Sequence, residues 1–259
     1  MWLIAKYQPV GIFSLKVGVA TSTGAKTLFL PTPFAIRTAL LDAAIRTHGL
    51  KTAVETFEIV KTLNIAAFPP EKIVVTNLFT KVLKPKRSDS KSKKANQSEN
   101  DELDEQTENS NTEDEEAMQR TISFREYAYL AGDLDLAFDG TEANLRQIRE
   151  LLYQVTYFGK RGSFFQLLNL SEQNEISEGF VILKSINSNN NQINGTAMAS
   201  YPLGIIQVMD DWGPSLNFDK LNIYSEESIR LGQDRIQEYV MLPYHLTKSS
   251  RGFSYYERI

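Results

Sequence analysis

Residues 72–83 read KIVVTNLFTKVL, and residues 121–130 read TISFREYAYL. Both stretches are rich in β-branched and aromatic residues, and the second alternates the apolar Ile122 and Phe124 with polar positions. This composition and this period of two are typical of β-strands. The chain between the two stretches has almost no apolar residues. We therefore predict that residues 72–130 form a long β-hairpin whose tip carries a polar insertion.

The insertion covers residues 88–119 and is strongly acidic, with 11 acidic residues against three lysines. Such a segment cannot bury enough apolar surface to offset the entropy lost on ordering, so we predict that it is disordered. The net charge of the whole chain is -4, but removal of the insertion leaves 25 basic and 21 acidic residues, a net charge of +4. The part that is predicted to fold is therefore mildly basic, which suits a polyanionic partner without identifying one.

The elements around the hairpin predict the rest of a first domain. Residues 2–19 are strand-like. Residues 28–49 contain a first helix, for which Thr32 is a plausible cap, Pro33 suits the first turn and Gly49 is a natural stop. Residues 52–63 predict a second helix, and residues 142–153 predict a third helix with a strand after it. With the two hairpin strands, the order becomes strand, helix, strand, strand, helix, strand. We therefore predict an α+β fold in which residues 1–175 form a ferredoxin-like domain, the architecture of RNA-recognition motifs.

The remaining residues, 176–259, predict a β-rich C-terminal region that packs on the first sheet or continues it. Asparagine-rich and glycine-containing turns separate its first strand candidates. Those candidates are residues 179–186, 201–209, 221–224 and 235–242.

Composition excludes several kinds of site. The chain has no cysteine and only two histidines, which excludes disulfides and thiolate metal sites and argues against a multi-histidine site. We find no signal peptide and no apolar stretch near the roughly 18 residues that a membrane helix needs. We therefore expect a cytoplasmic protein with no membrane contact, no metal and no cofactor.

Two pairs of neighbouring acids could suggest a metal site, but their surroundings favour structural roles. Asp133 and Asp135 alternate with leucines, so both project from one face of a strand, toward solvent. Asp210 and Asp211 precede glycine and proline and predict a turn. No further ligands can be named for either pair.

Basic and aromatic residues occur together in four segments, of which residues 157–165, YFGKRGSFF, are the clearest. Cations neutralise phosphates, and aromatic faces stack on unpaired bases. The alternative is that the rings belong to the core and the cations are merely solvated. From these segments the candidate RNA-binding residues are Lys81, Lys84, Arg120, Arg125, Lys160, Arg161, Phe164, Arg251 and Tyr255.

Three stretches resemble the Cas-five family, the subunit of type I CRISPR Cascade that caps the 5′ end of the guide RNA. They are residues 31–45, PTPFAIRTALLDAAI, residues 157–165, and residues 242–257, LPYHLTKSSRGFSYYE. The resemblance implies a ferredoxin-like domain that grips the 5′ handle of the guide RNA and a hairpin thumb that folds over it. It also implies neighbouring Cascade backbone and large subunits as partners, and target DNA as an indirect one.

Carried over by position, the resemblance places Arg37, Lys160 and Arg161 against the handle, and Lys81 and Arg125 along the RNA backbone. Lys16, in the N-terminal segment, completes the candidate set.

The resemblance does not extend to catalysis. Some members of the family cleave precursor guide RNA with tyrosine, lysine and histidine residues that cannot be aligned here, so we predict an RNA-binding subunit with no catalytic residues. One alternative is a metal-independent endoribonuclease that uses His245 or His48. Another is a protein-interaction module whose acidic tract, residues 88–119, recruits a basic partner.

Overall fold

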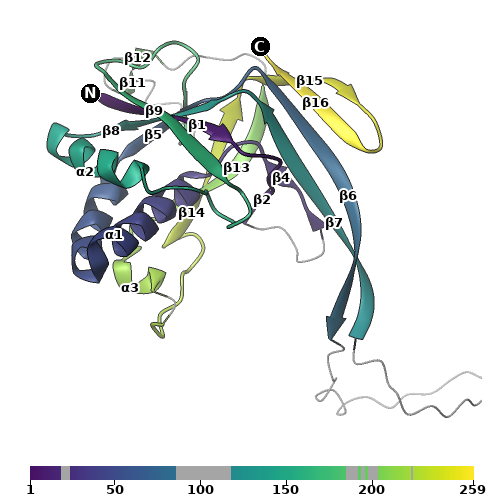
Figure 1. Cartoon of the computed structure of the whole chain (residues 1–259), viewed down its shortest axis with the longest axis horizontal. Helices are drawn as coiled ribbons and strands as arrows, with labels where there is room; N and C mark the ends of the chain where they lie inside the picture. The colour runs from purple at the N-terminus through teal and green to yellow at the C-terminus, as the bar shows by residue number, and fades with distance from the viewer. Residues whose placement is uncertain (19–23, 86–117, 185–191, 194–195, 198–203, 223) are drawn as a thin grey trace, which may run out of the picture. The chain divides into compact units, whose positions relative to one another are not determined.

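The computed structural model describes residues 1–18, 24–85, 118–184, 192–193, 196–197, 204–222 and 224–259. These residues combine helices with mostly antiparallel sheets, so the predicted mixed α+β class is confirmed (Figure 1). The described chain divides into two compact units, residues Met1–Leu78 with Phe124–Ile259, and residues Phe79–Ser123. The insertion predicted at residues 88–119 lies outside the described residues, apart from its last two.

The first sheet has the strand order β10-β5-β8-β1-β9, and all its neighbours are antiparallel. Its strands are β1 (Trp2–Pro9), β5 (Asn64–Phe68), β8 (Leu134–Asp139), β9 (Phe165–Gln173) and β10 (Val181–Ile182).

The prediction of the two middle strands of this sheet was wrong. It assigned them to the hairpin, but the structure places β5 and β8 there and inserts the hairpin strands between them along the chain. In β5, Ile65, Ala66 and Ala67 are all buried, so both faces of the strand are covered. A strand that is buried on both faces has no polar–apolar alternation to reveal it.

Two helices pack on one face of this sheet (Figure 1). In α1 (Pro33–Thr62), the amide of Ala35 donates to the hydroxyl of Thr32, 3.1 Å away, and Gly49 interrupts the helix with φ 80°. The two predicted helices therefore lie on either side of a kink at Gly49, where glycine adopts a positive φ without steric cost. In α2 (Glu142–Leu152), Leu145, Ile148, Leu151 and Leu152 face the core.

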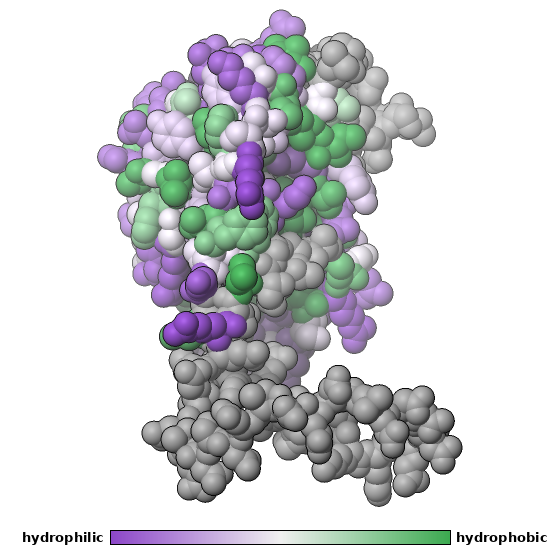
Figure 2. All heavy atoms as spheres, turned by 90° about the vertical axis from the view of Figure 1, so that its right-hand side faces the viewer, coloured by the Kyte–Doolittle hydropathy of each residue, from purple (hydrophilic) through white to green (hydrophobic). Residues whose placement is uncertain are grey.

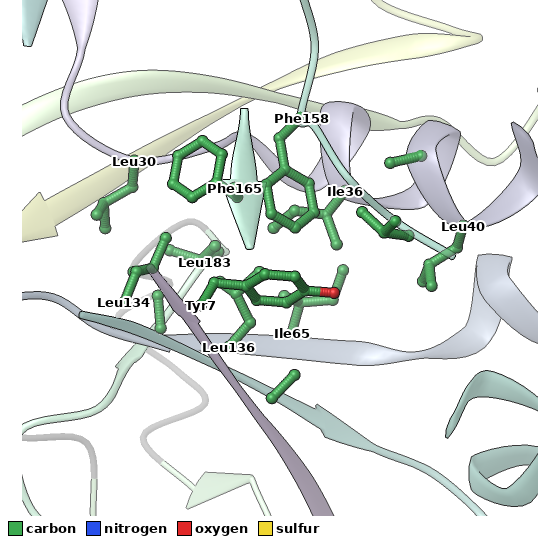
Figure 3. Close-up of a cluster of buried hydrophobic side chains, with 14 of the residues drawn as sticks. Tyr7, Leu30, Ile36, Leu40, Ile65, Leu134, Leu136, Phe158, Phe165 and Leu183 are labelled. Carbon is green, nitrogen blue, oxygen red and sulfur yellow. The ribbon is translucent and has the colours of Figure 1, made fainter. Parts of the chain in front are cut away.

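The core between these helices and the sheet contains part of the YFGKRGSFF stretch (Figure 3). Phe158 and Phe165 are buried, and their ring centroids lie 5.2 Å apart. The ring of Tyr7 meets Phe158 edge-on at 5.1 Å, and its hydroxyl donates to the carbonyl oxygen of Leu152, 3.2 Å away. These two phenylalanines therefore anchor the loop that carries Lys160 and Arg161.

The second sheet has the strand order β15-β16-β6-β7-β3. The two strands that the sequence assigned to the hairpin are neighbours in it. Its strands are β3 (Gly24–Ala25), β6 (Lys72–Pro85), β7 (Met118–Ala131), β15 (Tyr244–Ser249) and β16 (Phe253–Arg258).

The C-terminal region contributes further pairs of strands. One pair, β13 (Ile205–Trp212) and β14 (Arg235–Leu242), is antiparallel, and β13 contacts α1. Between them lies α3 (Phe218–Leu221), where Asn217 caps the helix by accepting from the amide of Lys220. The strand predicted at residues 221–224 is therefore wrong. The remaining short strands are β2 (Leu15–Lys16), β4 (Thr27–Leu28), β11 (Gln192–Ile193) and β12 (Thr196–Ala197). No described helix has the length and apolar character needed to cross a membrane.

Candidate nucleic-acid interface

The second sheet has one face on the core and one face that the described residues leave uncovered. Ile73 and Val75 on β6 and Ala128 and Leu130 on β7 are buried. Because side chains alternate along a strand, the residues between them point to the opposite face. Tyr129, for example, is 48% exposed.

We call this uncovered side the open face. Strand β16 extends it, since Phe253 pairs with Thr76 and Tyr255 pairs with Val74. Strand β15 extends it further, since Lys248 pairs with Tyr255. All the side chains of the open face are exposed or half-buried. They are Lys72, Val74, Thr76, Arg125, Tyr127, Tyr129, His245, Lys248, Phe253, Tyr255 and Glu257.

The open face therefore gathers residues that are far apart in the sequence. Two of the basic-aromatic segments, around Arg125 and around Lys248, flank β6 on either side. Four aromatic side chains and three basic ones share the face. Rings on a sheet surface can stack on unpaired bases, and the adjacent cations can neutralise phosphates. On the side of the molecule that Figure 2 shows, hydrophilic and hydrophobic residues lie next to one another.

A hydrogen-bonded cluster lies at one corner of the open face. The hydroxyl of Tyr255 donates to one carboxylate oxygen of Glu257 at 2.9 Å, and the hydroxyl of Thr247 donates to the other at 3.2 Å. Nε2 of His245 lies 3.3 Å from the Thr247 hydroxyl. The bond from Tyr255 is the main cause that lowers the pKa of Glu257, while partial burial and this same bond raise the pKa of Tyr255. Glu257 is therefore a fixed anion on a largely basic face.

Lys160 and Arg161 form a second basic site, in the exposed loop between α2 and β9. The amide of Ser163 donates to the carbonyl of Lys160 at 2.9 Å and closes the turn. A Cβ on Gly159 would lie 3.2 Å from the side chain of Leu15, so the loop runs beside the strand that carries the exposed Lys16. The backbone at Lys16 therefore lies close to the loop that carries Lys160 and Arg161.

Arg37 does not contribute to either basic site. Its side chain is buried, and its guanidinium binds Asp211, with 2.7 Å between Nε and the carboxylate. It also donates to the carbonyls of Val60 and Leu63 at the end of α1. The structure therefore contradicts the prediction that Arg37 faces the RNA, because these partners occupy its donors in the interior.

The other predicted residues lie on the strands of the second sheet or in its turns. Lys81 on β6 and Arg120 on β7 are exposed. Arg251 is exposed in the turn between β15 and β16, where its carbonyl accepts from the side chain of Asn77 at 3.2 Å. The side chain of Lys84 lies outside the described residues.

Sequence reasoning missed the contribution of β6 to the open face. Lys72, Val74 and Thr76 bridge the two basic-aromatic segments, yet none of them was a candidate. The signal was present, because these residues alternate with the buried Ile73 and Val75. Among the described residues, no group of three or more His, Cys, Asp or Glu side chains could hold a metal ion.

Comparison with known proteins places these features in context. No protein-family model matches the chain. A curated relative from Archaeoglobus fulgidus, CRISPR-associated protein Cas5, is 22% identical over 88% of this chain and 87% of its own length.

Two solved structures are also similar. A CRISPR protein from Archaeoglobus fulgidus matches with a TM-score of 0.47 and 11% identity, over all of this chain and 92% of that one. A chain of a CRISPR RNA-guided surveillance complex matches with a TM-score of 0.40 and 9% identity, over 93% of this chain and 88% of that one. The resemblance to the Cas5 family is confirmed by the curated relative: the chain is similar to a Cas5 protein over most of its length.

Proposed function

We propose that this protein is a non-catalytic RNA-binding subunit of a type I CRISPR Cascade-like surveillance complex, and that it grips the 5′ handle of the guide RNA. The observation that carries the proposal is the open face, where Tyr127, Tyr129, Phe253 and Tyr255 lie among basic side chains. Tyr129 and Phe253 are 48% and 39% exposed, and apolar ring surface in water favours a partner that stacks on it. The similarity to a protein named Cas5 supports the same function.

In this proposal the first sheet with α1 and α2 is a ferredoxin-like domain, and β6 and β7 form the thumb. Unpaired bases of the handle stack on the open face, while Lys81, Lys84, Arg120 and Arg125 follow the RNA backbone along the thumb. The loop residues Lys160 and Arg161, with Lys16 and Phe164, make a second contact. The backbone and large subunits of the complex are the protein partners, and the target DNA is recognised through base pairing with the guide.

A salt titration of RNA affinity tests the phosphate contacts. We expect the logarithm of the affinity for single-stranded RNA to fall as salt rises, by about 0.7 for each neutralised phosphate per tenfold change in salt. The Arg125→Ala/Lys248→Ala variant should have a slope shallower by about 0.7 to 1.4, because it removes up to two such contacts. The measurement is fluorescence anisotropy of a labelled guide RNA.

The control for the salt titration is Arg46→Ala/Lys51→Ala, which removes the same charge from the exposed surface of α1. It should leave the slope unchanged. A wild-type affinity that does not vary with salt would reject the phosphate contacts altogether.

One observation favours a second candidate, a metal-independent endoribonuclease. His245, Thr247 and Glu257 are linked through the Thr247 hydroxyl, and Tyr255 donates to the same carboxylate. A histidine held near a carboxylate can act as a general base. Under our proposal, this cluster positions RNA and performs no chemistry.

We therefore expect the full chain to leave precursor guide RNA intact in the presence of EDTA, as judged on a denaturing gel. No change should result from His245→Ala or from the control His48→Ala, whose side chain lies exposed on α1. Cleavage by the wild-type chain that His245→Ala abolishes and His48→Ala preserves would replace the proposed function with the nuclease.

A further inference from the structure

A groove lies along β9, outside the open face. It has a volume of about 530 Å³, which is within the range of ligand-binding clefts. One wall is the start of β9, and the other is the segment that follows α2. The lining residues are Val10, Tyr153, Val155, Thr156 and the run Phe164–Leu170.

The wall formed by β9 is the edge of the first sheet. Strand β9 pairs with β1 on one side, and it is the last strand in the order of the described sheet. At its start, the amide of Phe165 donates to the carbonyl of Thr156, 2.9 Å away, and covers the edge there. From Gln166 onward no described strand covers it. An uncovered edge presents a row of backbone donors and acceptors that another strand can pair with.

The groove also exposes large apolar side chains. The exposed fractions are 67% for Val10, 62% for Tyr153, 52% for Phe164 and 45% for Leu168. Their clustering beside a free strand edge is typical of an interaction surface, because isolated exposed apolar residues are common but grouped ones are not.

The chemistry of the lining favours a polypeptide over RNA. None of the lining residues is charged, so nothing in the groove itself would neutralise a phosphate. A strand edge instead matches the regular donors and acceptors of a second backbone. Lys160 and Arg161 lie in the loop before Phe164 and do not line the groove, so a strand beside residues 166–170 leaves them to the RNA.

We infer that the groove binds an extended segment of a neighbouring protein subunit, which adds to the first sheet as a strand beside β9. The wall Gln166–Leu170 pairs with about five residues, a length of about 17 Å. The segment carries apolar side chains at alternate positions, which pack on the exposed side chains of Tyr153 and Leu168. That the donor is a subunit of the same complex rests on the proposed function.

Amide hydrogen exchange on the full chain tests strand addition. We compare the isolated chain with the complex that assembles when it is co-expressed with the proteins of its neighbouring genes. We expect exchange at alternate amides within residues 166–170 to slow at least tenfold in the complex. The side-chain test uses Leu168→Arg and, independently, Tyr153→Arg, each of which should lower incorporation into the complex at least tenfold.

The matched control is Leu50→Arg, a residue of α1 that is 58% exposed and far from the groove in sequence. It should assemble normally. Three outcomes would overturn the inference: unchanged exchange on assembly, protection of residues 166–170 in the isolated chain at high concentration, which indicates a second copy, or protection on addition of RNA alone. The RNA content of the same complex is measured in parallel, so that loss of RNA binding reports on the proposed function separately.

Discussion

Replacing Tyr129 and Phe253 together with alanine is expected to weaken binding of single-stranded guide RNA at least about 30-fold. Stacking of a base on an aromatic side chain contributes about 1–3 kcal/mol, and the two rings lie on different strands of the open face, so each can hold a different base. The measurement is an equilibrium titration at fixed salt. The slope of affinity against salt should stay as in the wild-type chain, because neither substitution removes a charge.

The matched control for this variant is Tyr224→Ala, which removes a ring that is 89% exposed and lies outside the second sheet. It should bind RNA as the wild-type chain does. Thermal unfolding of all three proteins checks that the fold is retained, since Tyr129 and Phe253 are exposed and contribute little to the core. Wild-type affinity in the Tyr129→Ala/Phe253→Ala variant would remove the open face from the proposed function.

The open face shows what the sequence could and could not predict. The alternation in residues 121–130 correctly indicated a strand, β7, but Ile122, one of its apolar positions, is 67% exposed. The sequence could not indicate that β16 would pair with the edge of β6 that faces away from β7. Pairing between strands that are about 180 residues apart depends on tertiary packing rather than on local propensity.

Local chemistry did predict the helices well. The hydroxyl of Thr32 caps a helix that begins at the next residue, and Gly49 interrupts that helix at its own position. Both effects are local, so the sequence around these residues is enough to predict them. The YFGKRGSFF stretch was harder, because its rings divide between two environments. Phe158 and Phe165 are buried, whereas Phe164 is exposed. Composition alone could not distinguish the buried rings of Phe158 and Phe165 from the exposed ring of Phe164.

The burial of Arg37 and Asp211 could not be predicted from the local sequence either. Asp210 and Asp211 suggested a turn, but both lie in β13 and are buried, where Asp210 pairs with Arg235 and Asp211 with Arg37. Arg37 is buried because its guanidinium binds the carboxylate of Asp211, which lies 174 residues further along the chain. A lone arginine on an amphipathic helix is ordinarily a surface residue, and only its distant partner makes burial stable.

Arg37→Ala is expected to lower the free energy of unfolding by about 3–5 kcal/mol, the usual cost of removing one partner from a buried ion pair. The substitution leaves the carboxylate of Asp211 without its cation and frees the carbonyls of Val60 and Leu63, at the end of α1. Urea denaturation measures the change. Because the guanidinium faces the interior, the folded variant should bind RNA with the wild-type affinity.

Arg146→Ala is the control for this prediction, because Arg146 lies on α2 and pairs with Glu142 in the exposed (i, i+4) arrangement at 3.2 Å. Loss of such a pair costs only about 0.3–0.5 kcal/mol. A double variant, Arg37→Leu/Asp211→Leu, should recover much of the lost stability, since replacing both buried charges by apolar side chains leaves neither ion unpaired. If Arg37→Ala instead retained its stability and lost RNA binding, Arg37 would have to leave the interior and contact the RNA, and the burial assigned to it here would be wrong.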